Sequence, residues 1–194
     1  MKLQEVIKLL NSGKVGVMPT DTIYGIVGSA LNPKTVEEIY RLRKRASEKP
    51  MIILISSLKD LEKFEINLTN TQKEFLEKIW PNPVSVVLPC NLEKFKYLHR
   101  GTNSLAFRMP KDKRFLEILR KVGPIVAPSA NFEGKKFAET INEAKKYFGD
   151  SVAFYCEATR SSYKDGGDIK TMPSTLVTFD KDLIKVLRKG SFKI

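Results

Sequence analysis

Several short polar clusters in the sequence carry side chains that can hold a phosphorylated ligand. Arginine offers paired N–H donors that match phosphate oxygens, and serine and asparagine in a tight turn add neutral donors. Each cluster, taken alone, is more often a solvated turn or a helix end. The clusters are Thr20 to Tyr24, Arg43 to Lys49, Ser129 to Asn131, Pro173 to Thr175, and Arg188.

The first of these clusters lies in the stretch VGVMPTDTIYGIVG, from Val15 to Gly28. Its apolar start predicts a short buried strand, and Pro19 lacks the N–H needed to continue a ladder, so the strand should end there. The hydroxyl side chains of Thr20 and Thr22 then lie where the backbone leaves the sheet, a common place for a polar ligand. The alternative is that Thr20, Asp21 and Thr22 only form a turn.

Other kinds of catalytic site lack the residues that they need. The single histidine, His99, lies in a polar stretch and is predicted to be solvated, so Ser/His/Asp and Cys/His hydrolases and histidine-rich metal sites are excluded. Cys90 and Cys156 have no partner at metal-ligand spacing, and no metal ligands are predicted. The nearest approach to a P-loop, GSALNPKT at 28–35, has Pro33 where a glycine is required.

The composition indicates a folded chain with polyanionic partners. The 194 residues suit one domain, predicted to span residues 1–194, and 42% of them are hydrophobic. Lysine and arginine number 34 against 22 acidic residues, so the net charge is +12, as expected for a protein that binds nucleotide phosphates, RNA or both. No apolar run approaches the roughly 20 residues that cross a bilayer. We expect no membrane partner and a cytoplasmic location.

Helices and strands are predicted in mixed order. Asn32 and Pro33 begin a helix that ends in Arg41 to Arg45. The intermixed elements and the hairpin at the end predict an α/β fold with a mixed sheet and flanking helices. Further helices are predicted at 2–10, 57–64, 71–80, 115–120 and 140–148; strands at 15–18, 51–55, 84–88, 104–109, 124–127, 152–156, 175–179 and 183–187; and a polar loop at 158–173.

Seven motifs, in order along the chain, resemble those of the YrdC family of threonylcarbamoyl-AMP synthases. The resemblance covers essentially residues 1–190 and matches the short, single-domain form. The motifs are PTDTIYG (19–25), R-x-R-x3-K-P (43–50), WPNPVSVVL (80–88), SLAFRMP (104–110), APSAN (127–131), PSTLV (173–177) and VLRKG (186–190).

The resemblance implies a twisted α/β fold with a basic concave face, and a reaction. L-threonine, bicarbonate or CO2, and ATP with Mg2+ would give threonylcarbamoyl-AMP and pyrophosphate. Separate transfer proteins would then deliver the group to an adenosine next to the tRNA anticodon. The resemblance also makes tRNA or double-stranded RNA an expected partner.

The family's site residues carry over by position. Arg43 and Arg45 would stabilise the phosphoryl charge, and the mechanism needs no protein nucleophile. Threonine would be held by Thr20, Thr22, Tyr24 and Ser174 or Thr175. ATP would be held by Arg43, Arg45, Lys49, Ser85, Ser129, Asn131 and Arg188.

The chain also departs from the family pattern. Arg43 stands where the family usually has lysine, and a planar guanidinium places its donors differently from an ammonium. The segment FEGKKF at 132–137 replaces a stretch that often contains a second serine. Two alternatives stay open: a non-enzymatic RNA-binding protein of the same fold, like the YciO-like subgroup, and a ligase for another amino acid.

Overall fold

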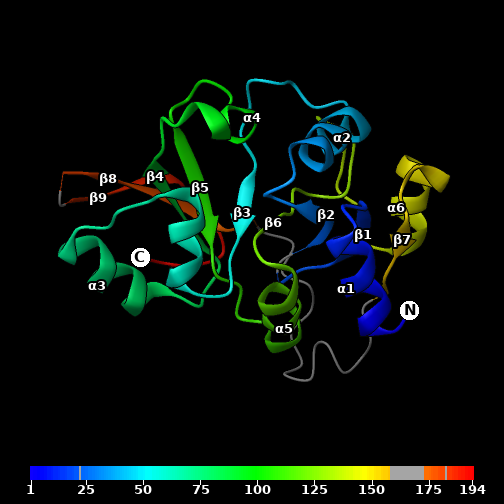
Figure 1. The fold of residues 1–194 in the computed structure, drawn as a ribbon, viewed down its shortest axis with the longest axis horizontal. Coiled ribbons are helices and arrows are strands. Elements are labelled where there is room, and N and C mark those ends of the chain that lie inside the picture. Colours follow the sequence, from blue (N-terminus) through cyan, green and yellow to red (C-terminus); the bar gives the residue numbers. More distant parts are fainter. Residues whose placement is uncertain (22, 158–172, 182) are drawn as a thin grey trace.

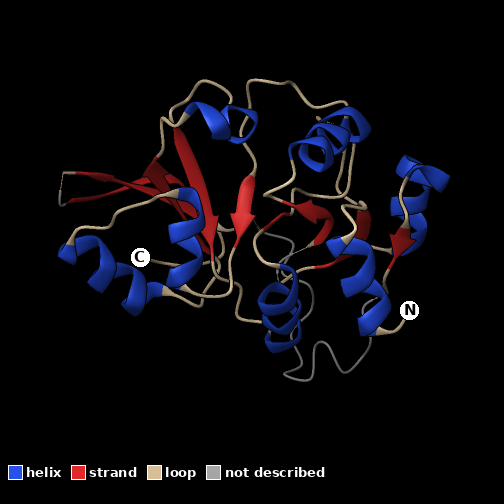
Figure 2. Ribbon diagram, viewed as in Figure 1, coloured by secondary structure: helices blue, strands red, loops and turns tan. Residues whose placement is uncertain are grey.

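The computed structural model describes residues 1–21, 23–157, 173–181 and 183–194. Helices and strands occur along the whole described chain (Figure 2). The strands are β1 (Gly16–Pro19), β2 (Tyr24–Ser29), β3 (Ile52–Leu54), β4 (Val84–Pro89), β5 (Ser104–Arg108), β6 (Ile125–Val126), β7 (Phe154–Tyr155), β8 (Thr175–Asp180) and β9 (Leu183–Arg188). The helices are α1 (Leu3–Asn11), α2 (Pro33–Arg43), α3 (Asn70–Ile79), α4 (Lys96–His99), α5 (Lys113–Val122) and α6 (Ile141–Phe148), with 3-10 helices η1 (Leu58–Phe64), η2 (Glu93–Phe95) and η3 (Gly149–Ser151).

One mixed sheet runs through the molecule in the order β7-β1-β2-β6-β3-β5-β4-β8-β9 (Figure 1). The pairs β1–β7, β3–β5 and β4–β8 are parallel, and the other neighbours are antiparallel. The mixed-sheet α/β prediction is therefore confirmed. In Figure 1 the β8–β9 hairpin and α3 lie at one end of the molecule, and α6 and β7 lie at the other.

Alternate residues of the central strands enter two different hydrophobic cores. Ile26 and Ile53 belong to the core that includes α2, whereas their neighbours Val27 and Leu54 belong to the core formed with α1 and α5. Successive side chains of a strand point to opposite faces of its sheet. Both faces are therefore covered by apolar residues, which explains the continuous apolar run at 51–55.

Local signals fix both ends of α2, the helix that leads to the predicted basic cluster. The Asn32 side chain accepts hydrogen bonds from the backbone N–H groups of Lys34 and Thr35, at 3.1 and 3.3 Å. Pro33 occupies the first turn, where no N–H is needed. The helix ends where Lys44 takes a left-handed conformation with φ of 50°. The predicted start is confirmed, and the end falls within the predicted basic turn.

Two expectations need correction. The segment 24–29, with two glycines, is not predicted as a strand, yet it forms β2 and pairs antiparallel with β1. His99 is not solvated: it is 3% exposed at the end of α4, and its Nδ1 accepts the N–H of Gly101 at 3.1 Å. Its neighbour Leu98 packs into the core that includes α2, whereas the charged Lys96 on the same short helix faces solvent.

The predicted loop at 158–173 lies, except for Pro173, outside the described residues. Within the described part of the chain, no helix combines the length and apolar character needed to cross a bilayer. The single-domain assignment, the basic concave face and the cytoplasmic location stay predictions.

Candidate active site

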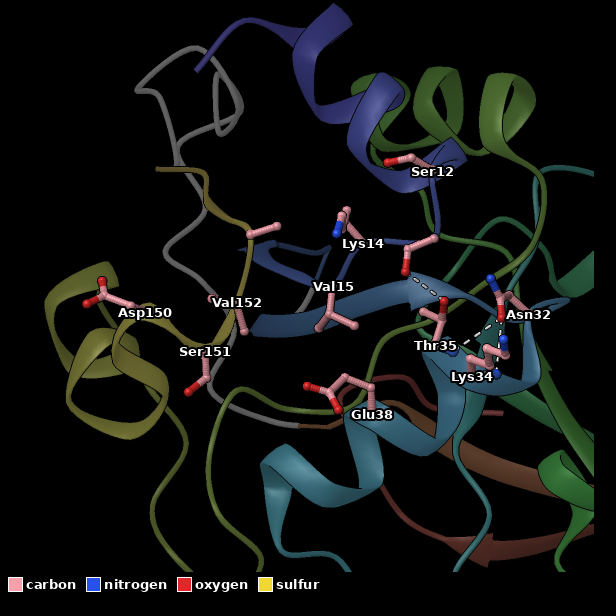
Figure 3. Close-up of a pocket in the computed structure, with 12 residues that line it drawn as sticks. Ser12, Lys14, Val15, Asn32, Lys34, Thr35, Glu38, Asp150, Ser151 and Val152 are labelled. Carbon is pink, nitrogen blue, oxygen red and sulfur yellow. Dashed lines mark hydrogen bonds between the residues drawn. The ribbon is translucent and has the colours of Figure 1, made fainter.

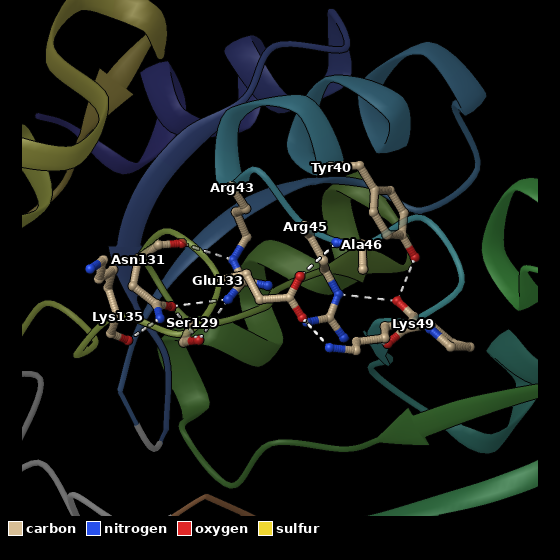
Figure 4. Close-up of polar contacts among 10 residues, drawn as sticks. Tyr40, Arg43, Arg45, Ala46, Lys49, Ser129, Asn131, Glu133 and Lys135 are labelled. Carbon is tan, nitrogen blue, oxygen red and sulfur yellow. Dashed lines mark hydrogen bonds and ion pairs between the residues drawn. The ribbon is translucent and has the colours of Figure 1, made fainter.

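The C-terminal end of α2 directs Arg43 into the molecule, toward the segment that follows β6. Arg43 is 3% exposed, and its Nε donates to the backbone oxygen of Asn131 at 3.2 Å. Its Nη2 donates to Ser129 Oγ at 3.1 Å and to Asn131 Oδ1 at 3.0 Å (Figure 4). Three residues that the resemblance assigns to one ATP site, 86 and 88 positions apart, are therefore in direct contact.

Backbone pairing with β2 holds this segment in place. Ser129 forms an antiparallel bridge with Gly25, and the N–H of Ala130 donates to the oxygen of Tyr24 at 2.9 Å. Ser129 Oγ also donates to Asn131 Oδ1, at 2.6 Å, and the Asn131 amide nitrogen donates to the oxygen of Lys135 at 2.6 Å. The donors and acceptors of both side chains therefore have fixed directions.

The connection between α2 and β3 brings further cations to the same place. Arg45 donates from Nε to the oxygen of Lys49 at 3.1 Å and from Nη2 to the oxygen of Pro50 at 3.0 Å. These bonds leave the Nη1 end of Arg45 turned toward the Glu133 carboxylate, at 3.9 Å. Glu133 also accepts from Lys49 Nζ at 2.7 Å and from the N–H of Ala46 at 2.6 Å (Figure 4). We call Arg45, Lys49 and the N–H of Ala46 the anion cradle.

The charges around the anion cradle favour an additional anion. Burial, and next the nearby Arg45 cation, lower the pKa of Arg43 to about 10, so Arg43 is still protonated at neutral pH. The hydrogen bond from Lys49 is the largest cause that lowers the pKa of Glu133 to about 2. The guanidinium groups of Arg43 and Arg45 thus lie near each other, and the carboxylate of Glu133 lies near both. An incoming phosphate would reduce their repulsion.

A second polar cluster lies where the turn between β1 and β2 meets β5. Arg108 Nη2 and Asp21 Oδ1 form an ion pair at 2.9 Å, with side chains only 5% and 7% exposed. Asp21 Oδ2 and Arg108 Nε are buried and have no hydrogen-bond partner among the described residues. Thr20 closes this turn, since its Oγ1 donates to the oxygen of Ile23 at 2.7 Å. Thr22, which the sequence assigns to the threonine site, lies outside the described residues.

Ser85, Ser174 and Arg188 lie next to this second cluster, because β4, which carries Ser85, pairs antiparallel with β5, which carries Arg108. The hydroxyl oxygens of Ser85 and Ser174 are 2.8 Å apart and buried, and Arg188 Nη2 donates to the backbone oxygen of Ser174 at 2.9 Å. Burial is the main cause that lowers the pKa of Arg188, and the Arg108 cation is the next. We call Asp21, Arg108, Ser85, Ser174 and Arg188 the arginine-pair cluster.

Two residues assigned to threonine have contacts that point to other tasks. Thr175 Oγ1 donates to the oxygen of Phe192 at 2.6 Å and accepts the N–H of Gly190 at 3.1 Å, so it fastens the segment after β9. Tyr24 is 5% exposed and belongs to the hydrophobic core. Ser174 lies beside Ser85 and Arg188, whereas Thr175 bonds to the segment after β9, and both assignments to threonine stay predictions.

Two cavities in the described part of the chain contain none of the predicted site residues. The larger, about 490 Å³, lies between the end of α1, the start of α2 and residues 150–153 (Figure 3). Some of its polar groups are already paired: Thr35 Oγ1 donates to the oxygen of Gly13 at 2.8 Å, and Asn32 caps α2. The second, about 390 Å³, lies against β4 and β8 and includes Gln72 and Phe179. The larger cavity sets Lys14 and Lys34 against Glu38 and Asp150, and the second has the single cation Lys181 among the described residues of its lining.

Sequence reasoning left three residues out of the site: Asp21, Arg108 and Glu133. The sequence predicts Asp21 only in a turn and places Arg108 only within the strand at 104–109. Glu133 belongs to the segment in which the chain departs from the family pattern. The available sequence signal for Glu133 is an acidic residue two positions after the SAN motif, in a chain whose other predicted site residues include several cations.

Comparisons with known proteins place this geometry in a family context. The model of the Sua5/YciO/YrdC family, described as "Telomere recombination", matches residues 8–190. A threonylcarbamoyl-AMP synthase of Bacillus subtilis is 28% identical over 192 residues, which are 97% of this chain and 53% of that protein. A putative threonylcarbamoyl-AMP synthase of Mycobacterium tuberculosis is 29% identical over 181 residues, which are 93% of this chain and 80% of that protein.

A solved structure agrees with the fold. Sua5 of Pyrococcus abyssi complexed with L-threonine superposes with a TM-score of 0.83 at 26% identity, and the match covers 97% of this chain and 54% of that one. The chain thus spans about half the length of the Bacillus subtilis and Pyrococcus abyssi proteins.

Proposed function

The chain belongs to the Sua5/YciO/YrdC family, and from that premise we propose that it is an L-threonylcarbamoyladenylate synthase. It would join L-threonine, bicarbonate or CO2, and ATP to give threonylcarbamoyl-AMP and pyrophosphate. The name of the Bacillus subtilis relative and the L-threonine bound to Pyrococcus abyssi Sua5 support this assignment.

The observation that carries the proposal is the convergence of cations on one carboxylate beside Ser129 and Asn131. The anion cradle already holds the carboxylate of Glu133 with an ammonium, a guanidinium and a backbone N–H. Donors of this kind also bind phosphate oxygens. We therefore assign the ATP phosphates to the anion cradle, with Arg43 presenting Ser129 and Asn131 beside them.

We assign L-threonine to the arginine-pair cluster. Arg108 is a buried cation whose Nε has no partner in the described part of the chain, so a carboxylate of the substrate would satisfy it. Ser85 and Ser174 offer hydroxyl groups next to Arg188. Thr22 follows Asp21 in the sequence and stays in this assignment as a prediction.

The proposed reaction needs positioning and charge stabilisation more than a protein nucleophile. The threonine amine adds to CO2 and loses a proton, which gives a carbamate. A carbamate oxygen then attacks the α-phosphorus, and the bond from that phosphorus to the oxygen bridging to the β-phosphate breaks, so pyrophosphate leaves. Arg43, Arg45 and Lys49 would stabilise the negative charge that the phosphates carry throughout.

Mg2+ is proposed to enter with the ATP phosphates. Among the described residues, no group of three or more His, Cys, Asp or Glu side chains is placed to hold a metal ion. Mg2+ commonly keeps several waters and binds through substrate phosphates, where it neutralises charge.

The test is threonine-dependent release of pyrophosphate. The pure protein is incubated with ATP, Mg2+, bicarbonate and each amino acid in turn, and pyrophosphate is measured. We expect release with L-threonine, and weaker release with serine, because one methyl group contributes only about 1 to 3 kcal/mol to discrimination. Release with a different amino acid alone would indicate a ligase of other specificity.

RNA binding without catalysis is the remaining candidate, favoured by the net charge of +12. It predicts RNA affinity that falls steeply with salt and no consumption of ATP with threonine. In the proposed function, by contrast, RNA is the eventual acceptor: separate transfer proteins would move the threonylcarbamoyl group to an adenosine of tRNA.

A further inference from the structure

The anion cradle is occupied by a side chain of the chain itself. Glu133 Oε1 lies 2.7 Å from Lys49 Nζ, and Oε2 lies 2.6 Å from the N–H of Ala46 (Figure 4). Arg45 and Lys49 are among the residues assigned above to the ATP phosphates. A carboxylate and a phosphate present the same kind of charged oxygen to such donors, so the two cannot fill the cradle together.

The backbone of Glu133 is anchored independently of its carboxylate. Its N–H donates to the oxygen of Arg43 at 2.9 Å. The ring of the preceding Phe132 packs edge-on against Tyr147, with centroids 5.1 Å apart, and lies beneath Lys44 Nζ at 4.4 Å. The Glu133 side chain is 23% exposed. It can therefore rotate out toward solvent while the segment stays in place.

We propose that Glu133 is an internal competitor of the phosphate ligand: it occupies the anion cradle when the site is empty and leaves when the phosphates of ATP bind. This inference rests on the proposed function and adds to it the residue that sets the affinity for phosphates. While in the cradle, the carboxylate keeps Arg45 and Lys49 close together despite their like charge. When pyrophosphate has formed, the same carboxylate returns and favours its release.

The test compares Glu133→Gln with wild type in binding inorganic pyrophosphate. The substitution keeps the shape of the side chain and an oxygen for the N–H of Ala46, but removes the charge. In calorimetry without Mg2+ at fixed ionic strength, we expect pyrophosphate to bind about two- to fivefold more tightly, the upper part of the range for removing one partly exposed ion pair. ATP should show the same direction.

Glu139→Gln is the matched control. Glu139 lies six residues further along and pairs at the surface with Lys136 at 3.2 Å. The change removes the same unit charge, so it should alter the affinity for pyrophosphate less than twofold. An equal gain in both variants would mean that net charge, not the cradle, is responsible, and would overturn the proposal.

Other results of the same measurement would also support or overturn the competitor role of Glu133. Unchanged or weaker binding by folded Glu133→Gln protein would show that Glu133 braces the site, and binding by neither protein would likewise overturn the competitor role. Glu133→Asp, which keeps the charge but shortens the reach, should fall between wild type and Glu133→Gln. Calorimetry needs neither threonine nor turnover, so absence of threonine-dependent pyrophosphate release would refute the proposed function while leaving this result intact.

Discussion

Replacing Arg43 by lysine, which keeps the charge, tests whether its guanidinium organises the site. Arg43 makes three hydrogen bonds to Ser129 and Asn131 from a buried position. A lysine ammonium is a compact group and cannot reproduce the spacing of Nε and Nη2. We therefore expect Arg43→Lys to keep the charge but lose about two of the three bonds.

The size of the effect follows from the bonds that are lost. A hydrogen bond to a charged group contributes about 1.5 to 3 kcal/mol, and partial replacement by the ammonium and water reduces the loss. We expect the free energy of unfolding to fall by about 1 to 3 kcal/mol for Arg43→Lys and about 3 to 5 kcal/mol for Arg43→Ala. For a chain of this length each kcal/mol corresponds to about 2 to 4 °C in Tm.

Activity should fall more than stability alone explains. In Arg43→Ala, loss of one preorganised donor should slow pyrophosphate release by about 10² to 10³. The assays are thermal unfolding by circular dichroism and threonine-dependent pyrophosphate release below Tm. Arg41→Lys is the control, because Arg41 lies on the same helix, is 68% exposed and pairs with Glu38 in a surface contact. If Arg43→Lys matches wild type in both assays, the bonds to Ser129 and Asn131 contribute nothing and the reasoning is wrong.

Three further perturbations address the rest of the site. Asp21→Asn should lower the free energy of unfolding by about 3 to 5 kcal/mol, because it leaves a buried guanidinium without its counter-ion; urea titration of the double variant with Arg108→Met should recover most of that loss, and no recovery would contradict the ion-pair account. Gly190→Ala should destabilise by about 1 to 3 kcal/mol and weaken threonine binding in calorimetry, since a Cβ would overlap the backbone around Ser174; an unchanged affinity would count against that assignment. The pKa of Glu133, about 2 in the folded chain against an ordinary 4.5, means that the unfolded chain binds the proton first, so this stabilisation is complete above pH 4.5 and is lost as pH falls toward 2; Glu133→Gln should therefore flatten the acid limb of the unfolding curve, and parallel curves would refute this.

Elements whose ends are marked by capping, proline or turn residues could be predicted from the sequence. The cap at Asn32 and the proline after it define the start of α2 without any knowledge of distant residues. The β8–β9 hairpin follows from two apolar runs joined by three polar residues. These signals depend only on neighbours in the chain.

Strand β2 could not be predicted because its glycines are required by close contacts with side chains from elsewhere in the fold. A Cβ on Gly28 would overlap the methyl group of Thr35 on α2, and one on Gly25 would lie 3.1 Å from the Thr20 methyl carbon. Glycine in a strand often marks such a close approach. In the sequence alone, the same glycines resemble a turn.

The site was only partly predictable for the same reason. The family resemblance grouped Arg43 with Ser129 and Asn131, and the geometry brings these three together, although their roles stay predictions. The ion pair of Asp21 with Arg108 joins residues 87 positions apart and depends on how the β1–β2 turn lies against β5. No local sequence pattern predicts that contact. Because both charges are buried, the ion pair nevertheless has a large effect on the stability of the folded chain.

The β1–β2 hairpin contacts both halves of the site: Asp21 at its turn holds Arg108, and Gly25 beyond it pairs with Ser129. A ligand that shifts this hairpin at one end can change the affinity at the other, and linkage requires the same factor in the reverse direction. Saturating amino acid and saturating nucleotide should therefore show cooperativity of equal size, whichever is titrated second.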